Sequence, residues 1–204
     1  MTLVKICGIT NAGDARVAAE AGADAVGFIF ARSPRHVGVD EARSISVALP
    51  EDTIRVGVFV DEEPEKILRI SQEVGLDLVQ LHGDETPETV TDLRKAGVKV
   101  MKALRVRSAD TLEAIDEYEA DLFLLDAYSA RARGGTGERF DWGVAKSLKG
   151  HDNIVVSGGL GPENVREAVE FFEPFGVDAS SSLEDGPGRK NGELVRRFVL
   201  AAKN

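Results

Sequence analysis

A strand-and-helix unit that recurs about every 25 residues most constrains the fold of this 204-residue chain. Short runs of branched apolar residues predict the strands, and longer periodic stretches predict the helices. The predicted strands are Leu3–Cys7, Ala25–Phe30, Arg55–Val60, Leu78–Leu81, Lys99–Leu104, Leu122–Asp126, Ile154–Val156 and Val177–Ala179. The predicted helices are Ala12–Ala21, Val39–Leu49, Pro64–Val74, Pro87–Ala96, Ala109–Tyr118, Phe140–Leu148, Pro162–Phe172 and Gly192–Lys203. Strict alternation of this kind implies a parallel sheet with the helices outside it.

Eight such units favour a closed barrel over an open, doubly wound sheet. The open sheet would place phosphate-binding glycines after its first strand. Here the first strand ends in Cys7-Gly8-Ile9-Thr10, and the chain contains neither G-x-G-x-x-G nor G-x-x-x-x-G-K-[ST]. The sequence therefore predicts a single-domain (β/α)8 barrel over residues 1–204.

Several predicted helix ends carry local signals. Thr86 before Pro87 is a typical N-cap, and Asp61 or Glu62 is the expected cap of the helix at Pro64. Ser108 is the expected cap of the fifth helix. Gly22, Gly75 and Gly97 are expected to close helices, because glycine tolerates the left-handed conformation there.

Charge and cysteine content narrow the partners. The net charge of −10 and pI of about 4.9 argue against nucleic acid or an anionic membrane as a partner. One cysteine excludes an intramolecular disulfide and fits a reducing cytoplasm. No apolar run approaches the length of a membrane span. The sequence does not distinguish a monomer from a homodimer.

The last two strands are followed by loops that suit a phosphate group. Ser157-Gly158-Gly159 follows the strand Ile154–Val156, and Pro162 is expected at the first position of the next helix. Ser180-Ser181-Ser182 follows the last strand. In eight-stranded barrels the loops after strands seven and eight frequently bind phosphate. An ordinary strand–loop–helix turn is the alternative for the glycine pair on its own.

The first strand carries a candidate nucleophile or base. Alternation places Lys5 and Cys7 on the inner face of the barrel. A buried ammonium group needs a partner, so Lys5 is expected to meet Asp178 or Asp126, and its charge can lower the pKa of the Cys7 thiol. A lone cysteine is otherwise often just a small buried hydrophobic residue.

Other polar residues follow strand ends, where the chemistry of such barrels takes place. Asp126 closes an apolar strand, and burial there would suit it to general-acid work, although a capping role is the alternative. Arg35, stiffened by Pro34, suits a carboxylate. His82 can act as a base, and no residue spacing indicates a metal site. The glycine-rich loop around Gly135 can close over a substrate.

The chain resembles phosphoribosylanthranilate isomerase along nearly its whole length. The matching segments, in order from residue 4 to about residue 190, are Lys5–Thr10, Gly27–Phe30 with Ser33–Arg35, Val56–Phe59, Gln80–Asp84, Leu125–Asp126, Gly134–Gly137 with Phe140–Trp142, Ser157–Leu160 with Pro162–Val165, and Asp178–Ser181. The resemblance implies a (β/α)8 isomerase of tryptophan biosynthesis that needs no cofactor and no metal.

The implied reaction is the Amadori rearrangement of N-(5′-phosphoribosyl)anthranilate. By this resemblance Asp126 protonates the ring oxygen and Cys7 removes the C2′ proton. Arg35 holds the anthranilate carboxylate, and the backbone at Gly158, Gly159, Ser180 and Ser181 holds the phosphate.

Two departures from the family pattern stand out. Ser182 replaces a glycine, so a Cβ can crowd the phosphate loop if that position needs a positive φ. Asn191 replaces an aspartate and can still cap the last helix. Two alternatives follow: a histidine-pathway aminoimidazole ribonucleotide isomerase, which Cys7 argues against, and a non-catalytic phosphosugar-binding barrel, for which Ser182 is the only hint.

Overall fold

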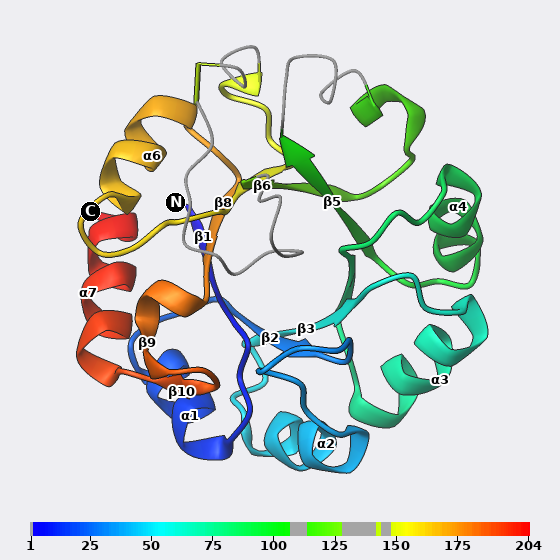
Figure 1. The fold of residues 1–204 in the computed structure, drawn as a ribbon, viewed down its shortest axis with the longest axis horizontal. Helices are drawn as coiled ribbons and strands as arrows, with labels where there is room; N and C mark the ends of the chain where they lie inside the picture. Colours follow the sequence, from blue (N-terminus) through cyan, green and yellow to red (C-terminus); the bar gives the residue numbers. More distant parts are fainter. Residues whose placement is uncertain (1, 107–113, 128–141, 144–147) are drawn as a thin grey trace.

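A closed eight-stranded barrel, surrounded by helices, forms the molecule (Figure 1). The computed structural model describes residues 2–106, 114–127, 142–143 and 148–204. The strands of the barrel are β1 (Leu3–Cys7), β2 (Ala25–Ile29), β3 (Ile54–Phe59), β4 (Leu78–Leu81), β5 (Val100–Val106), β6 (Leu122–Ala127), β7 (Ile154–Val156) and β8 (Gly176–Ala179). All neighbouring pairs are parallel, and β8 pairs with β1 to close the ring. The predicted fold class is confirmed.

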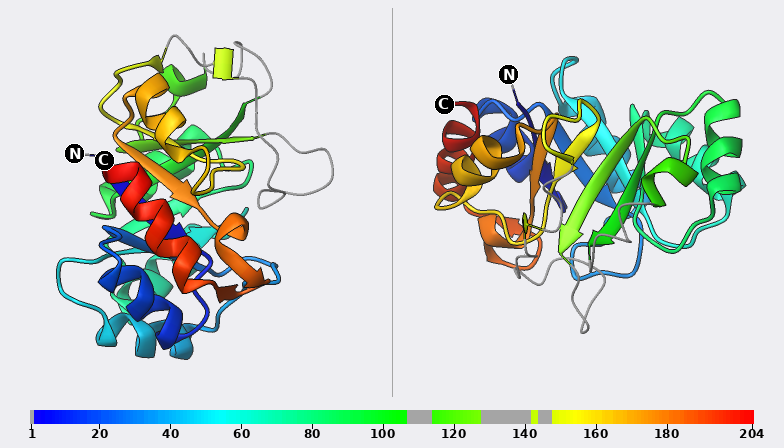
Figure 2. Two further views of the ribbon diagram at one scale, coloured as in Figure 1. Left: turned by 90° about the vertical axis from the view of Figure 1, so that its left-hand side faces the viewer. Right: turned by 90° about the horizontal axis from the view of Figure 1, so that it is seen from above.

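The helices lie outside the barrel (Figure 2). They are α1 (Ala12–Glu20), α2 (Val39–Ala48), α3 (Pro64–Val74), α4 (Pro87–Lys95), α6 (Val165–Phe172) and α7 (Gly192–Lys203), with short 3₁₀ helices η1 (Ala114–Glu117) and η3 (Ser181–Leu183). In Figure 1, α7 packs between α1 and α6. None of the described helices has the length and apolar character that a membrane crossing requires.

Local sequence explains individual helices. In α3, Pro64 is at the start, Ile67, Ile70 and Val74 are buried, and Gly75 ends the helix in the left-handed region at φ 71°. The residue at the N-cap is Glu63, which makes no capping bond, so the expected cap by Asp61 or Glu62 is wrong. Thr86 caps α4, as the sequence predicts.

Asn191 caps α7 through its Oδ1, which accepts hydrogen bonds from the backbone N–H groups of Glu193 and Leu194. This confirms that asparagine serves as the cap at this position.

Two layers of side chains make the core. The barrel interior holds Ala25, Val56, Leu78, Met101, Ala103, Leu124 and Val155, whereas Val4 and Ile6 belong to the larger cluster between the strands and the helices. The predicted orientation of the first strand is therefore confirmed. A period of two along each strand sends alternate residues to these layers.

The helix after β7 begins later than expected. It starts at Val165 rather than at Pro162, because the side chain of Asn164 folds the preceding residues into a turn. Its Oδ1 accepts a hydrogen bond from Gly161 N at 2.8 Å, and its Nδ2 donates to Gly159 O at 2.9 Å. An asparagine that satisfies its own local backbone in this way competes with helix formation.

Other expectations concern residues outside the described ranges. Ser108, most of the predicted helix Phe140–Leu148 and the loop around Gly135 all lie there. Of the predicted helix Ala109–Tyr118, the described part contains the 3₁₀ helix η1.

A short antiparallel hairpin of β9 (Glu184–Gly186) and β10 (Arg189–Lys190) follows the barrel and was not among the predicted elements. In Figure 2 this hairpin, coloured orange, lies at the end of the barrel to which the strand arrows point.

Candidate active site

A cavity of about 610 Å³ opens among the carboxyl ends of the strands. Cys7 from β1 and Asp126 from β6 both line it, although four strands, β2 to β5, lie between them in chain order. Each is nearly buried, with 6% of Cys7 and 4% of Asp126 exposed. The cavity is within the size range of small-molecule sites. The lining also includes Arg35, Gln80, His82, Asp178 and the loops 157–160 and 180–182.

Lys5 and Cys7 lie together on the inner face of β1. The Lys5 Nζ donates to Asp178 Oδ1 at 2.8 Å, which confirms one of the two expected partners. This pair meets because Lys5 and Asp178 are register partners in the β1–β8 pairing. Ser157 Oγ donates to the second Asp178 oxygen at 3.0 Å. An inward-facing ammonium group is thus neutralised, as its burial demands.

Opposing effects act on the Cys7 thiol. Burial raises its pKa, while the neighbouring Lys5 ammonium acts to lower it, and the pKa is raised overall. Lys5 therefore acts to lower the thiol pKa, as expected, but burial raises it by more and the net shift of the pKa is upward. For Lys5, burial acts to lower the pKa, but attraction to Asp178 and Cys7 wins and raises it to about 12.

Gly27 on β2 makes room for these two side chains. It is the register partner of Cys7, and a Cβ built there would lie 2.8 Å from Cys7 Sγ and 3.2 Å from Lys5 Nζ. Glycine at this position is therefore a consequence of the thiol and the ammonium on the adjacent strand.

Asp126 lies beside His82. The His82 Nε2 is 3.2 Å from Asp126 Oδ2, and the other ring nitrogen, Nδ1, is 2.7 Å from Gln80 Nε2. All three side chains line the cavity. The structure thus brings His82 to the acidic residue rather than to the thiol.

Arg35 is held by a residue that the sequence analysis missed. Its Nε and Nη2 donate to the carboxylate of Glu184 at 2.8 to 3.1 Å. Lys190 also donates to Glu184, at 2.7 Å. Both cations hold the pKa of Glu184 below its usual value, although burial opposes them. The cluster Gly186-Pro187-Gly188 between these two residues was the available signal for a hairpin.

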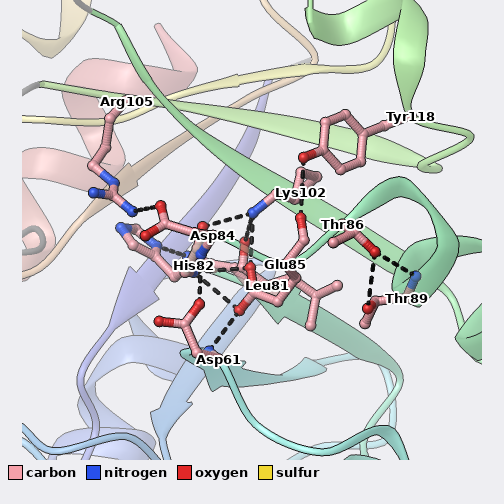
Figure 3. A network of polar contacts seen from close by, with 12 residues as sticks. Asp61, Leu81, His82, Asp84, Glu85, Thr86, Thr89, Lys102, Arg105 and Tyr118 are labelled. Atoms are coloured by element: carbon pink, nitrogen blue, oxygen red, sulfur yellow. Dashed lines mark hydrogen bonds and ion pairs between the residues drawn. The ribbon is translucent and has the colours of Figure 1, made fainter.

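A second missed group is the buried ion pair of Lys102 and Glu85 (Figure 3). Their nitrogen and oxygen are 2.7 Å apart, and the side chains are only 3% and 2% exposed. Lys102 also donates to the carbonyl of Gly83 at 2.9 Å, and Tyr118 donates to the Glu85 carbonyl at 3.0 Å. A lone lysine inside the apolar run 100–104 was the signal, since a buried charge requires a partner.

The two loops at the suspected phosphate site lie side by side. Gly158 and Gly159 have φ values of 83° and 68°, which favour glycine. Ser182, from the other loop, donates its hydroxyl hydrogen to the carbonyl of Leu160. Ser182 is not among the described residues with positive φ, so it lacks the strain that a Cβ would bring there.

Within the described ranges, no group of three or more His, Cys, Asp or Glu side chains is arranged to hold a metal ion.

The fold and the cavity at the carboxyl ends of the strands place the chain among the (β/α)8-barrel enzymes. The family model described as N-(5′-phosphoribosyl)anthranilate (PRA) isomerase matches residues 4–201, and the chain belongs to this family. It is therefore an isomerase of tryptophan biosynthesis, as the sequence resemblance implies.

Proteins with the same family name match this chain over its full length. The chain is 63% identical to the N-(5′-phosphoribosyl)anthranilate isomerase of Rubrobacter xylanophilus, and the match covers 100% of both chains. The isomerase of the same name from Geobacter sp. strain M21 is 51% identical over 100% of this chain and 98% of its own.

Solved structures agree with the fold. The crystal structure of phosphoribosyl anthranilate isomerase from Thermotoga maritima superposes with a TM-score of 0.92 at 43% identity, covering 100% of this chain and 99% of the other. A phosphoribosyl anthranilate isomerase in complex with reduced 1-(o-carboxyphenylamino)-1-deoxyribulose 5-phosphate matches with a TM-score of 0.87 at 42% identity, with the same coverage.

Proposed function

We propose that Cys7 and Asp126 are the base and the acid of an Amadori rearrangement that converts N-(5′-phosphoribosyl)anthranilate to 1-(2-carboxyphenylamino)-1-deoxyribulose 5-phosphate. The observation that carries this proposal is that the two side chains, from β1 and β6, line one cavity together with the loops after β7 and β8. A substrate held by its phosphate at those loops would present its sugar ring to both groups.

The first step opens the ring. Asp126 donates its proton to the ring oxygen, the C1′–O bond breaks with its electrons going to oxygen, and the nitrogen lone pair forms an iminium. The Cys7 thiolate then removes the C2′ proton, and the electrons of the C–H bond neutralise the iminium to give an enolamine. The enolamine relaxes to the ketone when C1′ gains a proton and the 2′-hydroxyl loses one.

The environment of Cys7 makes it a base that acts best at alkaline pH. Burial raises the thiol pKa, so the thiolate fraction is small at neutral pH. The thiolate that does form is a stronger base for that reason, and the Lys5 ammonium beside it offsets part of the cost of the buried charge.

Arg35 suits the anthranilate carboxylate even though it already binds Glu184. Glu184 occupies the side of the guanidinium that carries Nε and Nη2. The opposite edge, formed by Nη1 and the second Nη2 hydrogen, retains the fork geometry that binds a carboxylate through two parallel hydrogen bonds. Arg35 lines the same cavity as Cys7 and Asp126, which supports this assignment.

The phosphate is assigned to the backbone of Gly158, Gly159, Ser180 and Ser181. All four line the cavity, and the two glycines adopt positive φ, which lets their N–H groups approach an anion closely. The hydrogen bond from Ser182 to Leu160 joins the two loops, so we expect Ser182 to support phosphate binding rather than to obstruct it.

The test is a coupled fluorescence assay that generates the labile substrate in place. Cys7→Ser and Asp126→Asn should each lose on the order of 10²–10⁴ in kcat. Asp116→Asn, an exposed carboxylate on η1, is the matched control and should behave like wild type. If Cys7→Ser and Asp126→Asn both turn over like wild type, the assigned roles are wrong even though the fold is right.

Partners and location are narrower proposals. We expect a phosphorylated small molecule as the only substrate partner, no cofactor, and a cytoplasmic enzyme because of the single cysteine and the biosynthetic role. One solved structure is described as generated monomers of a dimeric phosphoribosylanthranilate isomerase from Thermotoga maritima. A monomer and a homodimer are both compatible with a cavity lined by one chain, and light scattering in solution distinguishes them.

A further inference from the structure

A row of three side chains crosses from β4 to β6 at the mouth of the barrel. Gln80 lies 2.7 Å from His82, and His82 lies 3.2 Å from Asp126. Resting on the function proposed above, we propose that His82 is a positioning residue for the acid Asp126, held in one tautomer by Gln80. Nothing in the family comparison assigns a role to either residue.

The contact with Gln80 determines which ring nitrogen carries the proton. The Gln80 Nε2 is a donor only, so His82 Nδ1 must accept its hydrogen bond. A neutral imidazole that accepts at Nδ1 carries its proton at Nε2, which faces Asp126 Oδ2. The opposite orientation of the Gln80 amide would reverse the tautomer, and the experiment below measures the tautomer directly.

A donor at Nε2 suits the step that Asp126 performs. When Asp126 gives its proton to the ring oxygen, a negative charge remains on the carboxylate. An N–H group already directed at this carboxylate stabilises the charge without any reorganisation during the reaction. His82 keeps its own proton throughout, so this role differs from that of a base.

A buried network fixes the backbone around His82 (Figure 3). The next residue, Gly83, donates its N–H to both oxygens of Glu85 at 3.0 Å, and its carbonyl accepts from Lys102. The Glu85 carboxylate also accepts from the Asp61 backbone at 2.9 Å. The loop after β4 is thereby tied to the end of β3 and to β5.

Close packing leaves this loop little freedom to move. Asp61 adopts a φ of 49°, and a Cβ on Gly83 would lie 2.2 Å from Asp61 Oδ1. The His82 backbone N–H also donates to the Phe59 carbonyl at 2.8 Å. The Lys102–Glu85 ion pair therefore does more than stabilise the fold, because it fixes the backbone of His82, which contacts Asp126.

A double-mutant cycle separates positioning from mere structural support. His82→Ala should lower kcat about 10- to 100-fold, the cost of losing a hydrogen bond to a charged group, with KM changed less than about threefold. His82→Gln retains an N–H near the Nε2 position and should recover most of this loss. In the Asp126→Asn background, His82→Ala should cost less than about twofold, since the amide develops no negative charge for His82 to stabilise.

The tautomer of His82 and the folding of each variant are measured in separate experiments. The chain has three histidines, so a ¹⁵N-histidine spectrum compared with that of His82→Gln assigns the His82 signals. We expect the proton at Nε2 in the unliganded enzyme. His151→Ala, an exposed position, is the control for turnover, and thermal unfolding shows that each variant is folded.

Three results would overturn the inference: a proton at Nδ1, an equal loss from His82→Ala with and without Asp126, or a loss confined to KM. If Asp126→Asn is impaired but His82→Ala costs the same in both backgrounds, the positioning role of His82 is refuted and the acid role of Asp126 stands. A fully active Asp126→Asn refutes the proposed acid, and the positioning role with it.

Discussion

Replacing Glu85 by glutamine tests whether the buried ion pair is as important as its geometry indicates. The substitution keeps the shape of the side chain but leaves the Lys102 ammonium, 3% exposed, without its counter-charge. Breaking a buried pair by removing one partner costs about 3–5 kcal/mol. The low end, about 3 kcal/mol, applies here because Lys102 keeps the Gly83 carbonyl at 2.9 Å as an acceptor.

This free energy translates into a measurable shift of the melting temperature. Globular proteins unfold with an entropy of about 2.1 cal/mol/K per residue, so a chain of 204 residues loses roughly 2.3 °C for each kcal/mol. Glu85→Gln should therefore lower Tm by about 7 °C, measured by circular dichroism or calorimetry. Activity measured well below Tm should fall as well, because the same network holds His82.

Two further variants make the reasoning refutable. Lys102→Met should cost a similar amount, and the double variant should be no less stable than either single one, since neither charge is then left unpaired. Glu73→Gln, which breaks the exposed contact with Arg69, is the control and should shift Tm by less than about 2 °C. A strictly additive double variant, or a loss in Glu85→Gln no larger than the control's, would refute the argument.

Two other predictions follow from the site. Because burial raises the Cys7 pKa and the thiolate is the base, kcat/KM should rise with pH across the alkaline range. In Cys7→Asp, if it is active, the rise in kcat/KM should move several pH units towards acid. A pH profile identical to that of wild type would contradict the assignment of Cys7 as the base. Ser182→Gly removes the hydroxyl bond to the Leu160 carbonyl, worth about 0.5–1.5 kcal/mol, so inhibition by inorganic phosphate should weaken roughly 2- to 10-fold with kcat nearly unchanged. Unchanged phosphate inhibition would show that this bond does not support the loop.

Much of the barrel is determined by local sequence. Short runs of branched apolar residues predict the eight strands to within one or two residues at their ends, because such a run is recognised from neighbouring residues alone. The ends of the helices were predicted less accurately where a side chain bonds to the nearby backbone. Asn164 delays the helix after β7 to Val165, and a cap at Glu63 needs no side-chain bond at all.

The catalytic candidates could also be named before the structure was known. Cys7, Asp126 and Arg35 stand at or just after strand ends, and the topology of a barrel brings all such ends to one face. The lone charge of Lys5 inside an apolar strand indicated that a buried partner must exist, and Lys102 carries the same signal but was missed. Only for Lys5 did the candidate partners include the residue that the structure shows.

The amino-acid sequence by itself therefore determined the repeating units, the barrel and the polar residues at its mouth. Tertiary structure alone decided which charges meet: Lys5 with Asp178 across 173 residues, and Arg35 with Glu184 across 149. Such pairs depend on the register with which β8 closes against β1 and on how the following hairpin folds back over the mouth. Register is a property of the whole closed ring, so no local pattern can specify it.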